Sequence, residues 1–375
     1  MGPKHCYADF PNASIRSGKS VVVLVGRIAQ LVEQRTENPC VPGSIPGPAT
    51  TSFSREVPLC RPISFQRPEN PLAFPKWLAK VIRSRNHTVA LSIIMKSATQ
   101  IHLADVQSVY SGAEGRLWEL LMGEQIHLGG FQSSVDLAKR AGLAAGMCGV
   151  DLGCASGAGM RFLVRFVKIA RMTGVDATPA MVELGRHRVA AEGLDASIDF
   201  VLGDACDTGL PTEEFDFVWG EDAWCCVENK PQLIAEASRL IRPGGKIAFT
   251  DWVEGPAGLT NAEAESLLNF MKFPNLLTLD EYQTLLLNTG CRSRVVLNTD
   301  RLATSLPIYL EMIEKQLTYD TLKIINFDTA QAAKLVDQLR FIQSLAEAGK
   351  IVQGLIVAEK MPERSPDPRR PVRGQ

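Results

Sequence analysis

The chain has 375 residues, of which 45 % are hydrophobic and 22 % are charged, and its formal net charge is −1. This composition is typical of a globular protein and offers no basic field for nucleic acid or a membrane surface. The nine cysteines include no Cys-x-x-Cys pair, so we expect no disulfide framework, no metal site and a reduced, cytoplasmic setting.

Residues 1–94 show no lasting hydrophobic period, and four prolines between positions 39 and 48 interrupt any element. A disordered extension and a transit peptide both fit this composition. A third interpretation explains more. Within residues 26–51, "IAQLVEQ" and "GSIP" back-translate into sequences that resemble the D arm and the TΨC arm of a tRNA gene. We therefore interpret this segment as a translated tRNA gene and expect the protein proper to begin at Met95.

Strands and helices alternate after residue 95. Short apolar runs that end at glycine or acidic residues predict strands at 148–154, 171–177, 198–204, 215–222 and 246–252. Helical spacing, with proline or glycine at the ends, predicts helices at 158–170, 179–193, 230–245 and 279–290. Two further strands are predicted at 291–298 and 350–360.

This alternation predicts an α/β fold with a doubly wound, mostly parallel seven-stranded sheet. We expect one domain over residues 95–360, with a core of about 140–298 and 350–360. The helix-like segment at about 299–349 is interpreted as a helical cap over the active site. Residues 361–375 are charged and rich in proline, which predicts a disordered tail.

Three aspartates stand at the ends of the first three predicted strands, namely Asp151, Asp176 and Asp204. Ligands of open parallel sheets bind beyond the carboxyl ends of the strands. A carboxylate at Asp176 can accept both hydroxyls of a ribose, Asp204 can help to read an adenine edge, and Asp151 can hold an ammonium. Any one of them could instead cap a helix or form a turn, but three in register favour a ligand.

The first strand leads into the glycine-rich turn "DLGCASGAG", which contains Gly153, Gly157 and Gly159. Glycines let the backbone approach a ligand and let the next helix pack closely. The dinucleotide pattern G-x-G-x-x-G is absent, which argues against a nicotinamide-dependent oxidoreductase. A binding module without catalysis is a second alternative, and turnover would distinguish it.

Residues 149–252 resemble the core of class I S-adenosylmethionine-dependent methyltransferases. The matching elements are "VDLGCASGAG", "GVDAT", "GDACDTGLP", "FDFVWGEDAW" and "RLIRPGGKIAFTD". The resemblance implies S-adenosyl-L-methionine as cofactor. It also implies a set of cofactor-binding residues, namely Asp151, Gly153, Gly157, Asp176, Ala177, Asp204, Ala205 and Glu221.

A narrower likeness covers nearly all of residues 105–360. The elements "MGEQIHLGGF", "VWGEDA", "FTD" and "AGKIVQG" are similar to those of sarcosine/dimethylglycine-type N-methyltransferases, with Met122 where that group has tryptophan. The likeness implies methyl transfer to a small amine. Related families methylate phosphoethanolamine, tocopherols and sterols, so a phenol, quinone or lipid-like acceptor is the alternative.

Four residues are candidates for the reaction itself, namely His127, Glu221, Asp222 and Tyr110. The histidine and the two carboxylates can serve as general base, and the tyrosine can close over the cofactor. Plain packing and a surface turn are the competing interpretations. Trp224 and Trp252 can line an ammonium pocket through cation–π attraction or belong to the core.

Overall fold

The computed structural model describes residues 96–97 and 101–362 of the chain. The expectations for residues 1–94, which include the tRNA-like segment 26–51, lie outside the described residues. The same holds for all but two residues of the predicted tail.

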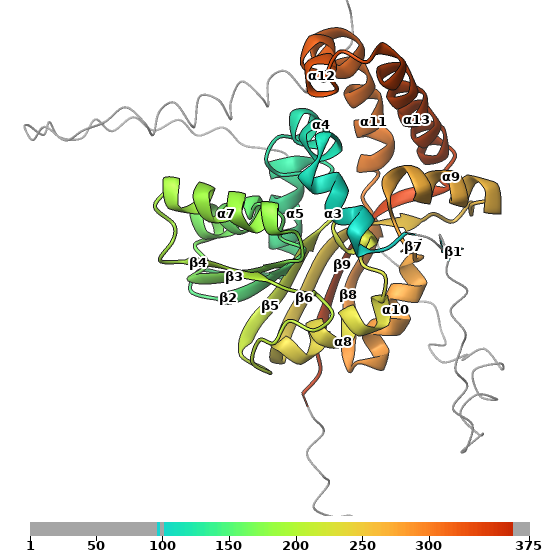
Figure 1. Ribbon diagram of the computed structural model, residues 1–375. Coiled ribbons are helices and arrows are strands. Elements are labelled where there is room, and N and C mark those ends of the chain that lie inside the picture. The colour runs from blue at the N-terminus through green and yellow to red at the C-terminus, as the bar shows by residue number, and fades with distance from the viewer. Residues whose placement is uncertain (1–95, 98–100, 363–375) are drawn as a thin grey trace, which may run out of the picture. The chain divides into compact units, whose positions relative to one another are not determined.

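The central element is a seven-stranded sheet (Figure 1) with the strand order β4-β3-β2-β5-β6-β9-β8. The strands are β2 (Cys148–Leu152), β3 (Arg171–Asp176), β4 (Ile198–Leu202), β5 (Phe215–Glu221), β6 (Ile241–Glu254), β8 (Cys291–Asn298) and β9 (Ile351–Lys360). Only β9 runs antiparallel to its neighbours within this sheet. The predicted α/β fold with a mostly parallel seven-stranded sheet is confirmed.

Helices lie on both faces of this sheet (Figure 1). One buried cluster joins the sheet to α8 (Lys230–Leu240) and α10 (Leu279–Asn288). A second cluster joins the opposite face to α5 (Gly130–Ala141), α6 (Ala158–Phe162) and α7 (Pro179–Ala191). The strand order reverses between β2 and β5, so the crevice at their carboxyl ends is the expected ligand site.

The remaining elements belong to three segments of the chain: its amino-terminal part, the part after β6, and the part between β8 and β9. The amino-terminal ones are β1 (Lys96–Ser97), α3 (Leu103–Ser111) and α4 (Ala113–Met122). Strand β1 pairs with β7 (Asn275–Leu276), which follows α9 (Asn261–Met271). The segment between β8 and β9 forms α11 (Arg301–Glu311), α12 (Thr318–Ile324) and α13 (Thr329–Glu347). The predicted helical insertion before the last strand is therefore present.

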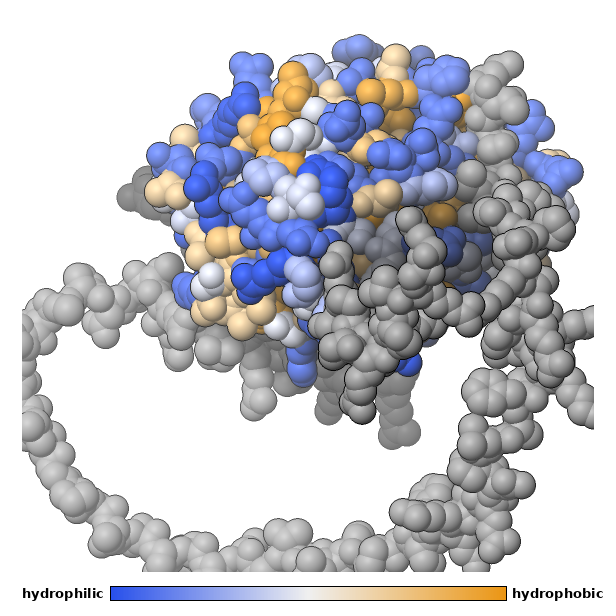
Figure 2. Space-filling model, turned by 90° about the horizontal axis from the view of Figure 1, so that it is seen from below, coloured by the Kyte–Doolittle hydropathy of each residue, from blue (hydrophilic) through white to orange (hydrophobic). Residues whose placement is uncertain are grey.

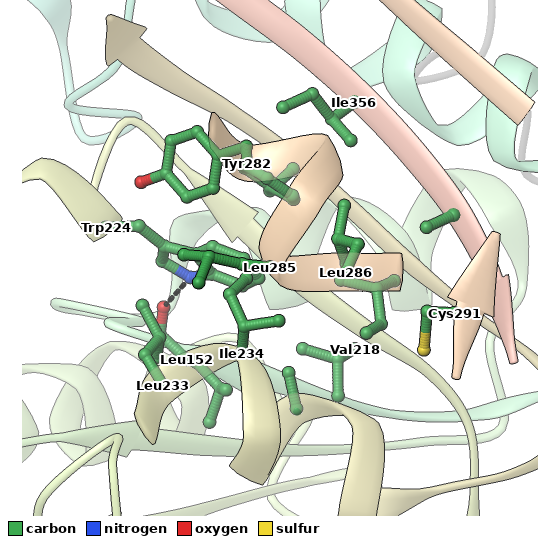
Figure 3. Packing of buried hydrophobic residues seen from close by; sticks show 14 of the residues in the cluster. Leu152, Val218, Trp224, Leu233, Ile234, Tyr282, Leu285, Leu286, Cys291 and Ile356 are labelled. Carbon is green, nitrogen blue, oxygen red and sulfur yellow. Dashed lines mark hydrogen bonds between the residues drawn. The ribbon is translucent and has the colours of Figure 1, made fainter. Parts of the chain in front are cut away.

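Trp224 belongs to the core between the sheet and α10. Its indole N–H donates to the Leu152 carbonyl over 3.0 Å, and its ring stacks on Phe249 with ring centroids 4.0 Å apart. Figure 3 shows Leu285 of α10 beside this ring and Ile234 of α8 below it. The core interpretation of Trp224 is therefore correct, and the ammonium-pocket interpretation is wrong for this residue.

The predicted helix over 230–245 is five residues too long, because α8 ends at Leu240 and β6 already begins at Ile241. Pro243 has no amide hydrogen and would clash inside a helix, and it also disfavours helical geometry at the residue before it. Gly244 has a φ of +80°, and the pairing of β6 with β5 shifts register in this region. The Arg-Pro-Gly-Gly run is thus the irregular start of a strand.

The described surface in the view of Figure 2 is mostly hydrophilic, and its hydrophobic side chains lie in small groups. None of the helices within 101–362 has the length and apolar character needed to cross a membrane.

Candidate active site

A cavity of about 1170 Å³ lies at the carboxyl ends of β2, β3, β4 and β5, and α3 contributes to its wall. We call it the main cavity. Typical ligand pockets measure roughly 300–1,000 Å³, so it has room for a nucleoside cofactor and a second molecule. Ten of the eleven predicted site residues line it, namely Tyr110, His127, Asp151, Gly153, Asp176, Ala177, Asp204, Ala205, Glu221 and Asp222.

The glycine turn after β2 needs two of its glycines for different reasons. Gly153 has a φ of +82°, and a Cβ there would lie 2.8 Å from the Cβ of Ala223 across the cavity wall. Gly157 has a φ of +76°, and its Cβ would lie 2.6 Å from the ring of Phe200. Gly157 is the one predicted residue outside the cavity wall. Its prediction as a cofactor contact is not supported, because its small size serves the packing of α6 against the sheet.

Asp176 organises the turn at the end of β3. Its two carboxylate oxygens accept the backbone N–H groups of Ala155 and Thr178 over 2.9 and 2.8 Å. Burial raises the pKa of this carboxyl group, and the two hydrogen bonds oppose the shift. The Gln107 side chain of α3 donates to the next carbonyl, that of Ala177, over 2.7 Å, which ties α3 to this wall.

The turn after β4 is closed by Asp204, whose Oδ1 accepts the backbone N–H of Cys206 over 2.8 Å. Ala205 lies between them and lines the cavity. The turn thus presents a carboxylate and a small residue at the place predicted for an adenine edge.

His127 and Glu221 form a buried pair at the end of β5. Their side chains are 4 % and 5 % exposed, and His127 Nε2 lies 3.4 Å from Glu221 Oε1. The Ser134 hydroxyl of α5 donates to the same oxygen over 2.8 Å, and the Trp219 indole donates to Oε2 over 3.0 Å. Burial raises the pKa of Glu221, while His127 and the two donors oppose the shift.

The other nitrogen of His127, Nδ1, is buried, and no described residue forms a hydrogen bond with it. Nε2 forms a hydrogen bond of 3.3 Å with the Ser134 hydroxyl. Because that hydroxyl donates its own hydrogen to Glu221, Nε2 is the donor, which leaves the Nδ1 lone pair free to accept a proton. A buried polar atom without a partner is unusual in a native protein and suggests a bound group.

A second buried carboxylate faces Glu221. A Cβ at Gly159 would lie 3.0 Å from Glu221 Oε2 and 3.5 Å from Asp151 Oδ2. Burial, followed by the charges of Glu221 and Asp176, raises the pKa of Asp151. Two buried carboxylates at one place favour a cation between them.

Asp222 was predicted as a candidate base, but its oxygens are already engaged. Its Oδ2 accepts the backbone N–H of Leu128 over 2.8 Å, and the Gln353 amide donates to both oxygens over 2.9 and 2.7 Å. The residue has a φ of +52° and joins the end of β5 to the segment after His127 and to β9. This geometry supports a positioning role for Asp222 in place of the predicted base.

Tyr110 of α3 also lines the cavity, with its hydroxyl 4.0 Å from Cys226 Sγ. The neighbouring Cys226 and burial raise the pKa of Tyr110, so the hydroxyl keeps its proton and can donate a hydrogen bond.

Comparisons with known proteins show what this chain resembles. Residues 150–249 match the family model described as a methyltransferase domain. The chain contains a methyltransferase domain. It is 35 % identical over 102 residues to the phthiotriol/phenolphthiotriol dimycocerosates methyltransferase of Mycobacterium leprae, over 27 % of this chain and 36 % of that protein. It is 30 % identical over 151 residues to the 27-O-demethylrifamycin SV methyltransferase of Amycolatopsis mediterranei, over 40 % and 55 %. These matches span about a third to a half of the relatives' length.

Solved structures show the same fold. The phosphoethanolamine N-methyltransferase 2 of Haemonchus contortus, solved with phosphomonomethylethanolamine and S-adenosylhomocysteine, matches with a TM-score of 0.61 and 22 % identity. This match covers 68 % of this chain and 59 % of that one. The [4+2]-cyclase SpnF matches with a TM-score of 0.57 and 18 % identity over 68 % and 95 %. The fold of the methyltransferase domain therefore occurs with more than one chemistry.

The main cavity of the methyltransferase domain is acidic. No lysine or arginine is among its described lining residues, whereas eight carboxylates are, namely Glu124, Asp151, Asp176, Asp204, Asp207, Glu221, Asp222 and Glu228. Glu124 pairs with Arg161 and Arg188 behind the wall. Such a field attracts cations and repels anions.

The predicted helical cap at about 299–349 does not cover the main cavity in the structure. Among the described residues, none from 299–349 lines the main cavity. The helices of that segment pack in a third buried cluster with residues from α9 and the end of β6. The wall opposite the strand ends comes from α3 and the segment 124–127.

Three contributors were missed from the sequence, namely Gln107, Gln125 and Ser134. Gln125 lines the cavity and donates to the Ser134 hydroxyl over 3.1 Å. Ser134 is fully buried on α5, and it is 87 positions away from Glu221 in the chain. A buried serine on an amphipathic helix gives no distinctive local signal, so only the fold brings it to the site.

Proposed function

We propose that this protein transfers a methyl group from S-adenosyl-L-methionine to a small-molecule acceptor. One observation carries the proposal. Asp151, Asp176 and Asp204, at three consecutive strand ends, line the same cavity as the buried His127–Glu221 pair. This is the arrangement expected for a nucleoside cofactor beside a proton-accepting group.

The cofactor fits the residues present. Its sulfonium makes it a cation, and the acidic main cavity favours a cation. Asp176 is the candidate for the ribose hydroxyls, and Asp204 with Ala205 for the adenine. Asp151 and Gly153 are the candidates for the methionine end. S-adenosyl-L-methionine supplies an activated methyl group, so the protein's main contribution is to align the acceptor and exclude water, which can lower a barrier by roughly 7–11 kcal/mol.

His127 is the proposed general base. Its Nε2 donates to the Ser134 hydroxyl, which donates to Glu221, so this chain of hydrogen bonds holds the ring in one tautomer. The Glu221 carboxylate, 3.4 Å from Nε2, stabilises the charge that forms on proton uptake. The free Nδ1 then accepts the proton that the acceptor loses as its lone pair bonds to the methyl carbon. Tyr110, protonated, can donate a hydrogen bond across the same cavity.

Formation of S-adenosylhomocysteine from labelled S-adenosylmethionine tests the activity. Replacement of His127 by glutamine should lower kcat by a factor of roughly 10²–10⁴ while the affinity for S-adenosylhomocysteine stays unchanged. His187→Gln is the matched control, because His187 lies exposed on α7 and outside the cavity wall. If the protein binds S-adenosylhomocysteine but transfers no methyl group to any amine, phenol, quinone or lipid acceptor, the methyl-transfer proposal is wrong.

The amine acceptor stays a prediction from the resemblance. A phenol, quinone or lipid-like acceptor is the alternative, and the geometry beside His127 bears on this choice.

A further inference from the structure

A second, smaller cavity of about 40 Å³ adjoins the main cavity. We call it the side cavity. The two share six wall residues, namely Val106, Tyr110, Ile126, His127, Asp222 and Cys226. The side cavity therefore adjoins the proposed base, and Asp204 of the predicted adenine turn does not line it.

The walls that the side cavity does not share are almost entirely apolar. They include the side chains of Trp118, Met122, Trp252, Met271 and Phe273. Its one lysine, Lys272, directly follows α9, where a positive charge complements the carboxyl end of a helix. Its one acidic residue, Asp222, has both oxygens occupied by Gln353 and the Leu128 N–H. Among its described lining residues, the side cavity thus offers no free carboxylate to an ammonium.

The charges also exclude one class of acceptor. A phosphate or carboxylate on a substrate needs cationic or amide donors to replace its water. The main cavity has eight carboxylates and no lysine or arginine among its described lining residues. An anionic acceptor would be repelled there and would find only Lys272 in the side cavity.

We propose that the acceptor is an uncharged molecule that places a short apolar group in the side cavity and a hydroxyl at His127 Nδ1. The proposal rests on the methyl-transfer function proposed above. It names the acceptor class and gives the side cavity a role as the specificity subsite. The unpartnered Nδ1 supports it independently, because a ligand hydroxyl supplies the hydrogen-bond donor that this buried atom lacks.

The size of the subsite limits the group that it takes. A cavity of about 150 Å³ holds benzene, so a space of about 40 Å³ takes one or two carbons and excludes a ring. Met122 and Met271 line it, and methionine side chains adjust readily to ligands.

A homologous series of probes tests the proposal, namely phenol, 4-methylphenol, 4-ethylphenol and 4-propylphenol. Their dissociation constants are measured by NMR titration of the full chain, with and without saturating S-adenosylhomocysteine. Each of the first one or two added carbons should tighten binding by about fourfold, and further carbons should not. Phenyl phosphate and phosphoethanolamine should bind at least tenfold more weakly than phenol.

Two substitutions of Met122 should change the gain in affinity per added carbon in opposite directions. Met122→Trp fills the side cavity and should abolish the gain per carbon, whereas Met122→Ala enlarges it and should extend the gain to longer chains. Met361→Trp is the matched control, since Met361 is exposed beyond β9 and lines neither cavity. The affinity for S-adenosylhomocysteine should stay within twofold of the parent in all three variants.

The outcomes separate this proposal from the proposed function. The acceptor class is wrong if the dissociation constant does not change along the phenol series, or if both Met122 variants show the same series as the parent. Tighter binding of the phosphate compounds than of phenol would also overturn it, even if methyl transfer to another molecule is found. If the phenols show the expected series but the protein neither binds nor forms S-adenosylhomocysteine, the subsite proposal stands. The methyl-transfer function is then refuted.

Discussion

The two carboxylate oxygens of Asp176 hold the neighbouring backbone and also leave acceptor positions for a ligand. Each of its carboxylate oxygens accepts one backbone N–H, which fixes the turns after β2 and β3. An ionised carboxylate has about four acceptor positions, so two remain for a ligand. The residue therefore shapes the cavity and can also bind within it.

Replacement of Asp176 by alanine should weaken the binding of S-adenosylhomocysteine by about 2–4 kcal/mol, because charged hydrogen bonds are worth roughly 1.5–3 kcal/mol each. Isothermal titration calorimetry measures the change. Asp199→Ala is the control, because Asp199 is exposed on β4, where it pairs with Arg171. Unchanged affinity in the Asp176 variant would contradict the assignment of this residue to the cofactor.

The roles of single residues were only partly predictable from the sequence. The three strand-end aspartates could be found because each follows a short apolar run. Asp222 follows such a run too, yet its partners Leu128 and Gln353 are 94 and 131 positions away in the chain. No local pattern distinguishes a carboxylate whose oxygens are occupied from one that is free, so the sequence alone predicts a base at Asp222.

At the scale of elements, predictability followed the strength of the local pattern. Strand β8 was predicted with its observed bounds, since two turns delimit it. Helices α3, α4 and α5 are not delimited by the sequence, although α3 supplies Gln107 and Tyr110 and α5 supplies Ser134. Helix α3 buries only two residues and so shows no clear apolar stripe, whereas α5 is amphipathic but buries two serines on its inner face.

A buried polar network joins α8, β6 and α10 beneath the site. Lys230 of α8 is fully buried, and its Nζ donates to Asn275 Oδ1 over 2.8 Å. Asp251 of β6 accepts the Tyr282 hydroxyl over 2.6 Å and the Cys225 backbone N–H over 2.8 Å. Burial raises the pKa of Asp251 to about 6, and the Lys230 charge opposes the shift.

This network predicts a pH dependence of stability. The pKa of Asp251 rises on folding from 3.8 to about 6, so the native state binds this proton more tightly than the unfolded state does. Its contribution to the free energy of unfolding is therefore most favourable below about pH 4. It decreases as the pH rises to about 6, by about 3 kcal/mol in total.

Asp251→Asn removes this ionisation and should flatten the curve of unfolding free energy between pH 4 and 6. Urea unfolding at several pH values measures it. Asp337→Asn is the control, because the Asp337 side chain is 76 % exposed on α13. An identical slope in the parent and the Asp251 variant would show that the carboxyl titrates normally.

At the scale of the whole molecule, the described elements from β1 to β9 supply the sheet, the helices on both its faces and the walls of both cavities. Strand β1 is the first of them, and it pairs with β7, where Asn275 is the partner of Ser97. Asn275 and the preceding Pro274 line the main cavity. A chain that begins at Met95 keeps this pairing, whereas a chain that begins at Leu103 loses it. The chain from Met95 therefore tests whether residues 1–94 are needed, and the chain from Leu103 tests whether the β1–β7 pairing is needed.

We predict that residues 95–375 bind S-adenosylhomocysteine and unfold in urea as the full chain does, because every contact described at the site lies within them. The chain from Leu103 should be less stable, since it loses the hydrogen bonds between β1 and β7.

The tRNA interpretation makes a separate prediction: the coding DNA over codons 26–51 should fold as a tRNA cloverleaf on the same strand. Weaker cofactor binding by the chain from Met95 would assign residues 1–94 a part in function. A native protein whose amino-terminal sequence starts at Met1 would contradict the tRNA interpretation, because residues 26–51 would then be translated.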